Sequence, residues 1–124
     1  MQIIETNTAP AAIGTYSQAV IAGGMAYISG QIPLDPHSME LCSVDIVKQI
    51  DQVFHNVSMI CKASGGELAN IVKLNVYLLD LGAFALVNAA MERYFTRPYP
   101  ARAIIGIASL PRNAQIEVDA IMHL

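Results

Sequence analysis

The spacing of hydrophobic residues along this chain changes between two periods, and the change predicts where helices and strands lie. After Ser43, apolar side chains recur every three or four residues, which is the spacing of one helix face. We expect Ser43 to cap this helix, because its hydroxyl can accept a hydrogen bond from an unpaired backbone amide, and Gly65 and Gly66 to end it. The apolar face consists of Val47, Ile50, Phe54, Val57 and Cys61.

A second helix is predicted after Asp80, whose carboxylate can cap its first turn. Pro98 and Pro100 would stop this helix, because proline has no amide hydrogen to donate and clashes with the preceding turn. The apolar stripe of this helix consists of Ala83, Val87, Ala90, Met91 and Tyr94.

Two short apolar segments near the N-terminus, residues 15–22 and 25–30, flank Gly23 and Gly24. They predict a hairpin with a tight turn, because glycine readily adopts the positive φ that such turns need. Residues 32–42 contain Pro33 and Pro36 and are therefore expected to form a loop.

The remaining apolar segments predict further strands. Residues 101–109 and 115–123 are joined by a short turn segment, so they predict a second hairpin, and residues 3–4 predict a short N-terminal strand. Residues 71–79 are rich in β-branched side chains, which favour strands. Alternation places four residues of that segment on one face, namely Val72, Leu74, Val76 and Leu78.

The predicted order is therefore hairpin, helix, strand, helix, hairpin. Strand–helix–strand connections place both helices on one face of a mixed sheet, which indicates an α+β fold. The other face must also be covered, yet only 14% of the 124 residues are charged, against roughly 25% in an average soluble domain. We therefore expect a single domain, residues 1–124, that forms an obligate homo-oligomer through large apolar interfaces.

Charge and residue usage exclude several classes of protein. The net charge of −3 and the scattered positions of the seven basic residues argue against a nucleic-acid partner. We expect no signal peptide at the N-terminus, because no basic region leads into an apolar stretch there, and no membrane helix in the longest uncharged stretch, because it contains several glycines and prolines. Cys42 and Cys61 have no motif spacing, so we expect reduced thiols and a cytoplasmic location. The three histidines lie far apart, so no metal site is expected.

Because charges are scarce, Arg102 stands out at the head of an apolar segment that predicts a buried strand. A guanidinium is costly to bury without a partner. One interpretation is a small carboxylate ligand, which the planar guanidinium can bind through two parallel hydrogen bonds. The other is that Arg102 pairs with Glu117, in the next apolar segment, or with groups at the surface. The spacing leaves both interpretations open.

Alternation also indicates where these side chains point. Glu117 alternates with Ile116 and Val118, so it points away from the face that those two residues bury. Arg102 shares its direction with Ile104. We expect both charged residues to face a subunit interface and not the helix layer.

Three polar residues are further candidates, each with an ordinary structural alternative. Tyr16 is either a core ring or a pocket wall. Ser29 ends a strand, where it either leads into a loop or lines a pocket. Asn88 lies on the second predicted helix, where an exposed asparagine needs no function.

Seven parts of the chain match one known pattern in order and spacing: Ala9–Ala19, Ile28–Pro33, Ile71–Lys73, Tyr77–Leu81, Phe84 with Val87-Asn88, Tyr99–Arg102, and Leu110-Pro111 followed by Ile116–Ile121. Together they resemble the RidA family, also called YjgF, over essentially the whole chain. The resemblance implies a chorismate-mutase-like α+β fold. It also implies a homotrimer whose sheets form a central barrel, with ligand clefts between subunits.

The resemblance further implies an activity, the hydrolysis of reactive 2-imino and enamine acids such as 2-aminoacrylate and 2-iminobutanoate to 2-oxo acids and ammonia. By this resemblance, Arg102 binds the substrate carboxylate and Glu117 activates water. Tyr16, Ser29 and Asn88 fall on the family's other substrate-binding positions. The reaction implies no cofactor and no metal, because imines already hydrolyse in water and need only positioning and one acid–base group.

The chain departs from the family pattern at three places. Ile104 occupies a substrate-binding position where many deaminating members have cysteine. Thr15 replaces the proline that usually precedes the tyrosine, and the segment between Phe95 and Tyr99 is shorter than usual. A second hypothesis, of a different class, is a non-catalytic trimer that binds small carboxylates, as a metabolite sensor or protein-interaction module. It needs Arg102 but not Glu117.

Overall fold

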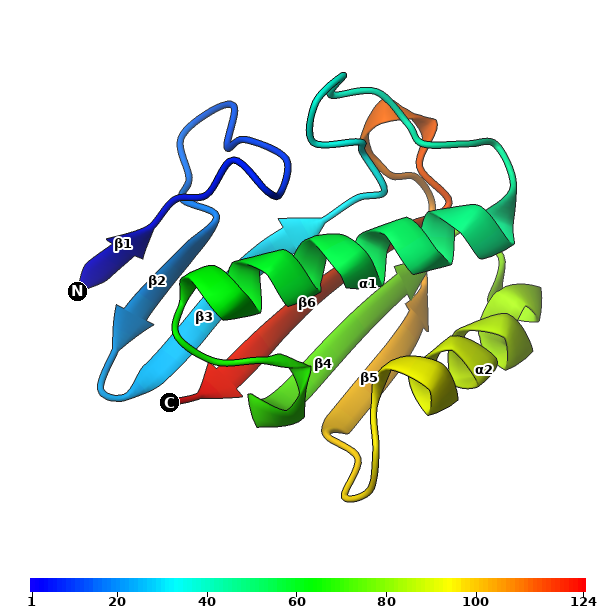
Figure 1. The fold of residues 1–124 in the computed structure, drawn as a ribbon. Helices are drawn as coiled ribbons and strands as arrows, with labels where there is room; N and C mark the ends of the chain where they lie inside the picture. The colour runs from blue at the N-terminus through cyan, green and yellow to red at the C-terminus, as the bar shows by residue number, and fades with distance from the viewer.

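The computed structural model describes residues 1–124 and contains one six-stranded sheet with two helices on a single face (Figure 1). The strand order is β1-β2-β3-β6-β4-β5, with β4 and β5 parallel and all other neighbours antiparallel. The predicted mixed α+β sheet with both helices on one side is thus confirmed. The elements are β1 (Gln2–Ile4), β2 (Ala19–Ala22), β3 (Met25–Gln31), α1 (Ile46–Ala63), β4 (Ile71–Leu78), α2 (Phe84–Tyr94), β5 (Ala101–Gly106) and β6 (Ile116–His123), with short 3₁₀ turns at η1 (Leu68–Asn70), η2 (Leu81–Ala83) and η3 (Pro111–Asn113).

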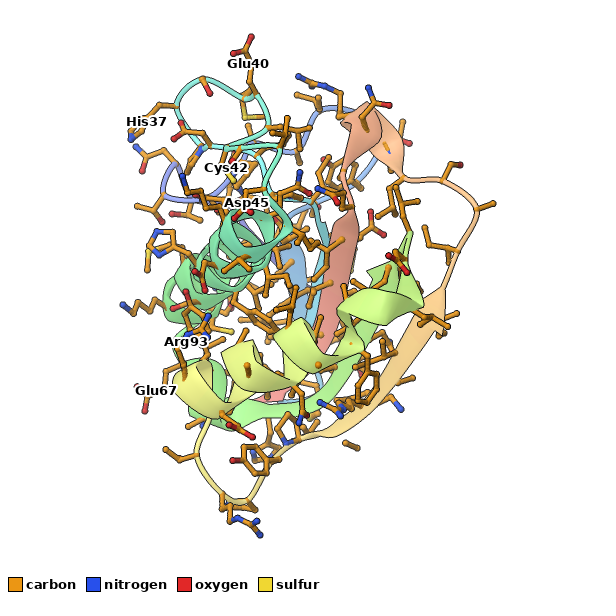
Figure 2. All side chains as sticks on the ribbon, turned by 90° about the vertical axis from the view of Figure 1, so that its right-hand side faces the viewer. His37, Glu40, Cys42, Asp45, Glu67 and Arg93 are labelled. Carbon is orange, nitrogen blue, oxygen red and sulfur yellow. The ribbon has the colours of Figure 1, made fainter.

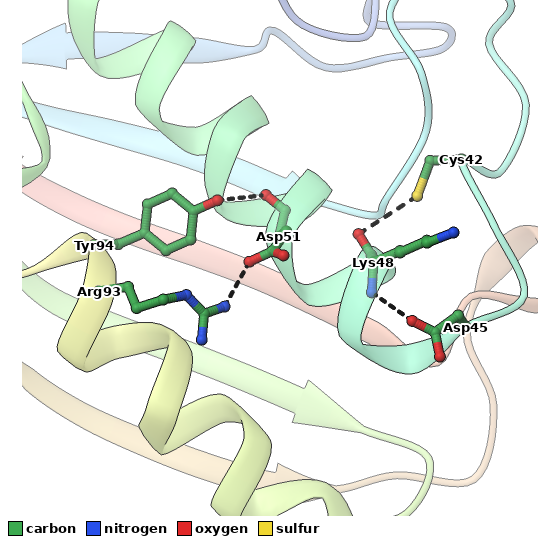
Figure 3. A network of polar contacts seen from close by, with 6 residues as sticks. All are labelled: Cys42, Asp45, Lys48, Asp51, Arg93 and Tyr94. Atoms are coloured by element: carbon green, nitrogen blue, oxygen red, sulfur yellow. Dashed lines mark hydrogen bonds and ion pairs between the residues drawn. The ribbon is translucent and has the colours of Figure 1, made fainter.

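Helix α1 begins after Asp45, and the expectation that Ser43 caps it is wrong. The Asp45 carboxylate accepts a hydrogen bond from the backbone N–H of Lys48 at 3.0 Å, as Figure 3 shows. The Ser43 hydroxyl instead accepts one from the N–H of Asp45 and orders the turn before the cap. At the other end Gly65 has φ 94°, which confirms the predicted glycine stop.

The two helices bury most of the predicted stripes. Val47 is an exception: it is 40% exposed, because the buried face of α1 is turned toward Val53 and Ile60. Asp80 caps the short turn η2 through the N–H of Gly82, and α2 follows directly. The buried residues of α2 are Val87, Ala90 and Met91.

Polar contacts connect α2 to α1 at the surface. The Arg93 guanidinium donates to the Asp51 carboxylate at 2.7 Å, and the Tyr94 hydroxyl donates to the Asp51 carbonyl at 3.3 Å (Figure 3). Beneath them, the Phe54 ring stacks on Tyr94 with 5.4 Å between centroids. These contacts hold the two helices side by side on the sheet.

The first predicted hairpin is confirmed and the second is wrong. Gly23 and Gly24 turn the chain between β2 and β3 with φ values of 58° and 74°. In contrast, β5 and β6 do not pair with each other: β5 lies at the edge beside β4, and β6 lies between β3 and β4. The burial pattern gives the reason, because every second residue of β6 is buried whereas no residue of β5 is.

Strand β4 also differs from the prediction at its start. Val72 is 44% exposed and Ile71 is buried in its place, because the register with β6 shifts between Ile71 and Lys73. Leu74, Val76 and Leu78 are fully buried, as expected. The sheet therefore has one face covered by helices and one face that no element of the chain covers, which is visible edge-on in Figure 2.

Two further expectations concern the thiols and membranes. Both cysteines are free; Cys42 is exposed, while burial raises the pKa of the Cys61 thiol to about 12. A thiol with that pKa is not reactive at neutral pH.

Neither of the two helices has the length and apolar character needed to span a lipid bilayer.

Candidate functional site

Five of the six sequence candidates line two separate cavities, which we call the acidic half-site and the basic half-site. The acidic half-site is a cavity of about 560 Å³ lined by residues of the loops after β1 and β3 and of η3. It includes three of the predicted residues, Tyr16, Ser29 and Glu117. Its remaining lining is Pro10, Ala11, Ile13, Gly30, Gln31, Ile32, Leu34, Met39, Pro111 and Arg112.

Glu117 lies on β6 and points to the uncovered face of the sheet, as its alternation with buried Ile116 and Val118 predicts. Gly30, on the neighbouring strand β3, leaves the space that its carboxylate occupies. A Cβ atom at Gly30 would lie only 2.9 Å from Glu117 Oε2. The glycine between Ser29 and Gln31 is therefore needed for the position of the carboxylate.

The protonation of Glu117 is altered by its surroundings. Burial raises the pKa of the Glu117 carboxyl above its usual range, and the negative charge of Asp119 raises it further. A carboxyl with a raised pKa exchanges protons more readily near neutral pH, which suits a group that must both accept and donate a proton.

Asp119 is itself held by two neighbours on β4. It accepts hydrogen bonds from Asn75 Nδ2 at 2.8 Å and from the Tyr77 hydroxyl at 2.9 Å. Tyr77 stands directly opposite Glu117 in the strand register. These four side chains form one polar cluster on the uncovered face.

Tyr16 and Ser29 shape the wall of the acidic half-site. The Ser29 hydroxyl donates to the carbonyl of Ser17, at the point where the register of β3 and β6 shifts. The Tyr16 ring is 49% exposed, and its hydroxyl accepts a hydrogen bond from the N–H of Ile13 at 3.4 Å. The first contact attaches the loop before β2 to strand β3, and the second lies within that loop, where the Tyr16 ring lines the cavity.

The basic half-site contains Arg102 and Asn88 in a cavity of about 260 Å³. Arg102 Nη1 donates to Asn88 Oδ1 at 3.0 Å and contacts Met91 Sδ at 3.2 Å, both on α2. The guanidinium carbon also lies 5.3 Å from the centre of the Phe84 ring, a cation–π distance. The rest of the lining is Glu92, Arg97, Tyr99 and Pro100.

The structure corrects two expectations for Arg102 and excludes its pairing with Glu117 within one chain. Its strand is an exposed edge and not buried. Its side chain lies on the helix side of the sheet, since its register partner Leu74 is buried there and its contacts are on α2. Arg102 and Glu117 therefore lie on opposite faces, and no ion pair joins them; the one ion pair of the chain is Arg93–Asp51.

Ile104 lines neither cavity. It is partly buried and packs against the core between sheet and helices. Within one chain its side chain therefore contributes packing.

Sequence reasoning did not identify two basic residues in these cavities. Arg112 lines the acidic half-site and donates to the Met39 carbonyl at 2.9 Å. Arg97 lines the basic half-site, and its guanidinium carbon lies 5.7 Å from the centre of the Tyr99 ring. Both residues lie beside a proline in a connecting segment, where no periodic pattern marks them. The sequence offered one indication: charged residues are scarce in this chain, so each arginine is a candidate for a functional position.

Comparison with known proteins identifies the family of the chain. Residues 6–124 match the model of a family described as Endoribonuclease L-PSP, which is the RidA/YjgF family. The chain belongs to this family. It is 47% identical over 120 residues to Protein DfrA of Myxococcus xanthus, covering 95% of this chain and 92% of that protein. It is 42% identical over 120 residues to the human 2-iminobutanoate/2-iminopropanoate deaminase, covering 97% of this chain and 88% of that protein.

Solved structures show the same fold. The crystal structure of RidA from an Antarctic Psychrobacter species superposes with a TM-score of 0.96 at 46% identity, with both chains covered in full. Escherichia coli TdcF, crystallised with bound serine, superposes with a TM-score of 0.95 at 36% identity, covering 100% of this chain and 99% of that one.

Proposed function

We propose that this protein hydrolyses 2-imino and enamine acids, such as 2-aminoacrylate and 2-iminobutanoate, to 2-oxo acids and ammonia. The observation that supports this most is the chemical complementarity of the half-sites. One presents a guanidinium suited to a carboxylate, and the other a partly buried carboxyl with a raised pKa. The name of the human relative, a 2-iminobutanoate/2-iminopropanoate deaminase, supports the same reaction.

The site is proposed to form between subunits of a homotrimer. Arg102 and Glu117 of one chain lie on opposite faces of the sheet, so they cannot meet around one small substrate. Arg102 of one chain can meet Glu117 of another if the β5 edge of one sheet lies against the uncovered face of its neighbour. The large hydrophobic side chains exposed on that face, including Tyr27 and Ile105, favour such an association.

Arg102 would bind the substrate carboxylate and fix the position of the reacting C=N carbon. Asn88, Met91 and the Phe84 ring already hold one side of the guanidinium, so little side-chain entropy remains to be lost when the ligand binds. The remaining N–H groups are available for a bidentate contact.

Glu117 would act as the acid–base group. Its carboxylate accepts a proton from water while the water oxygen forms a bond to the C=N carbon. The C=N electron pair moves to nitrogen, and the protonated carboxyl returns this proton there, which gives a carbinolamine. The carboxylate then takes the hydroxyl proton and delivers it to the nitrogen, the C–N bond breaks with its electron pair leaving on nitrogen, and the C=O bond forms as ammonia departs. Tyr16 and Ser29 would bound the space in which this water and the substrate lie.

An assay with two variants tests the reaction. A serine dehydratase generates 2-aminoacrylate, and the rate of pyruvate release is followed with and without the protein. We expect wild type to accelerate release, and Arg102→Ala and Glu117→Gln each to lose at least about a hundredfold in kcat/KM. Wild type without effect would refute the proposal.

The shared site is tested by mixing the two variants. Arg102→Ala and Glu117→Gln are co-expressed with different tags, and mixed oligomers are purified. If each site combines Arg102 of one chain with Glu117 of another, some sites in the mixed oligomers contain both intact residues, and part of the activity returns. If both residues of a site come from the same chain, no site is intact. Mixed oligomers as inactive as their parents would contradict the inter-subunit site.

The non-catalytic alternative, a trimer that only binds small carboxylates, predicts a different pattern. It has specific support in the basic half-site, whose Arg102 contacts are complete without Glu117. In that case a 2-oxo acid binds to wild type and to Glu117→Gln equally, and neither accelerates imine hydrolysis. Calorimetry alongside the pyruvate assay separates the two functions.

A further inference from the structure

The basic half-site contains a second guanidinium that the proposed reaction does not use. Arg97 lines the same cavity of about 260 Å³ as Arg102, together with Asn88, Tyr99 and Glu92. The chain has a net charge of −3 and only seven basic residues, yet two of them line one small cavity. This concentration of positive charge is local, because the other five are distributed over the rest of the chain.

Neither of these arginines is neutralised by the protein. The one ion pair of the chain is Arg93–Asp51, so Glu92, which also lines the cavity, pairs with neither Arg97 nor Arg102. Arg97 makes no hydrogen bond with its side chain, whereas Arg102 uses one nitrogen on Asn88 and Met91. Both guanidinium groups therefore have donors available for an anionic ligand.

The position of Arg97 is nevertheless defined. Its guanidinium carbon lies 5.7 Å from the centre of the Tyr99 ring, which forms part of the same cavity wall. Pro98 and Pro100 flank Tyr99 and restrict this short connection between α2 and β5. An arginine at cation–π distance from an aromatic ring beside a cavity keeps its N–H groups available for an anion.

We propose that Arg97 determines specificity and selects substrates that have a second acidic group, namely dicarboxylic 2-imino acids. Arg102 binds the carboxylate next to the C=N carbon, and Arg97 binds the carboxylate at the far end of the side chain. This inference rests on the proposed function and names its substrate class. A monocarboxylic ligand leaves the Arg97 guanidinium without an anionic partner, so it binds more weakly.

The test measures binding, so it does not depend on turnover. The ligands are 2-oxoglutarate and 2-oxopentanoate, product-like 2-oxo acids of equal chain length that differ by a terminal carboxylate in place of a methyl group. Calorimetry gives the ratio of their dissociation constants for wild type and three variants. Arg97→Gln removes the charge, Arg97→Lys keeps the charge but not the planar fork, and Arg93→Gln is the matched control, since it removes one charge of α2 outside the cavity.

We expect wild type to prefer 2-oxoglutarate by about tenfold, from one charge-assisted contact at an exposed position. The ratio should fall close to one in Arg97→Gln, take an intermediate value in Arg97→Lys and stay at the wild-type value in Arg93→Gln. A wild-type ratio near one, or an unchanged ratio in Arg97→Gln, overturns the inference and leaves the proposed deaminase intact. Failure of both ligands to bind wild type overturns the carboxylate site itself, and with it this inference.

Discussion

At the scale of single residues, the chemistry depends on what stands beside Glu117. Its carboxyl lies against Gly30 of β3, its own strand carries Asp119 two residues further on, and Tyr77 is its register partner on β4. Burial and the Asp119 charge act in the same direction and both raise the pKa of Glu117. Asp119 is thereby a positioning residue for the proposed reaction, since it acts on Glu117 and not on the substrate.

Replacing Asp119 with asparagine should move the pH profile of the reaction. Glu117 must be ionised to accept a proton from water, so its pKa sets the acid limb of kcat/KM. The neutral amide in Asp119→Asn no longer repels the Glu117 charge, so that pKa falls and the acid limb moves to lower pH. The pKa stays above the ordinary carboxyl range, because burial is the larger cause. The measurement is kcat/KM between about pH 4 and 9 for both proteins, a range that spans the titration of a carboxyl with a raised pKa.

Asn75→Ala serves as the control for that experiment, because it removes a hydrogen bond to Asp119 but leaves the aspartate charge in place. We expect a smaller displacement of its acid limb than in Asp119→Asn. An acid limb in Asp119→Asn that coincides with wild type, or moves to higher pH, would show that Asp119 does not act on Glu117.

At the scale of elements, the helices and the first hairpin could be predicted from the sequence, because their signals are local. Gly23-Gly24, the stripe of α2 and the glycine stop of α1 all depend on residues a few positions apart. The position of β6 in the sheet could not be predicted, because it depends on pairing with β3 and β4, which are distant in the sequence. Its alternation of buried and half-buried residues predicts a strand but does not name the neighbours.

The same distinction applies to the candidate site. Alternation predicted correctly that Glu117 points to the uncovered face. The predicted direction of Arg102 was wrong, because β5 was expected to pair with β6 in a hairpin, whereas it is a parallel edge strand beside α2. Arg97 and Arg112 were missed because loop residues have no periodic signal. The chemistry of single residues was thus more predictable than their grouping into cavities.

The N-cap of α1 gives a stability prediction at this scale. Asp45→Ala removes the acceptor for the N–H of Lys48 and should lower the free energy of unfolding by about 1 kcal/mol. Asp45→Asn keeps an acceptor oxygen and should stay within a few tenths of a kcal/mol of wild type. Urea unfolding followed by circular dichroism measures both. Equal losses in the two variants would show that the carboxylate charge matters more than the cap.

At the scale of the whole molecule, the sheet has one face that no element of the chain covers. One face is packed under α1 and α2, and the other presents half-buried and exposed side chains from β3, β4, β5 and β6. Covering that face with neighbouring subunits would bury apolar surface that a monomer leaves in water.

A charged residue at this face should therefore break the assembly and the activity together. Ile105 is 46% exposed and stands opposite Tyr77 on the uncovered face. We expect Ile105→Glu to sediment as a smaller species than wild type and to lose deaminase activity in proportion. Val47→Glu, at a 40% exposed position on α1, is the control and should keep both properties. An Ile105→Glu protein of wild-type size would contradict the proposed interface.

The placement of Arg102 and Glu117 on opposite faces also determines how many sites of an oligomer one mutated subunit would inactivate. Each chain would contribute its arginine to one cleft and its glutamate to another, so a subunit lacking both residues would disable two clefts while a subunit lacking one would disable a single cleft. Catalysis would also fade on dilution, because an isolated chain would possess every required group and still be inactive. Protein concentration would then regulate the proposed activity without any effector.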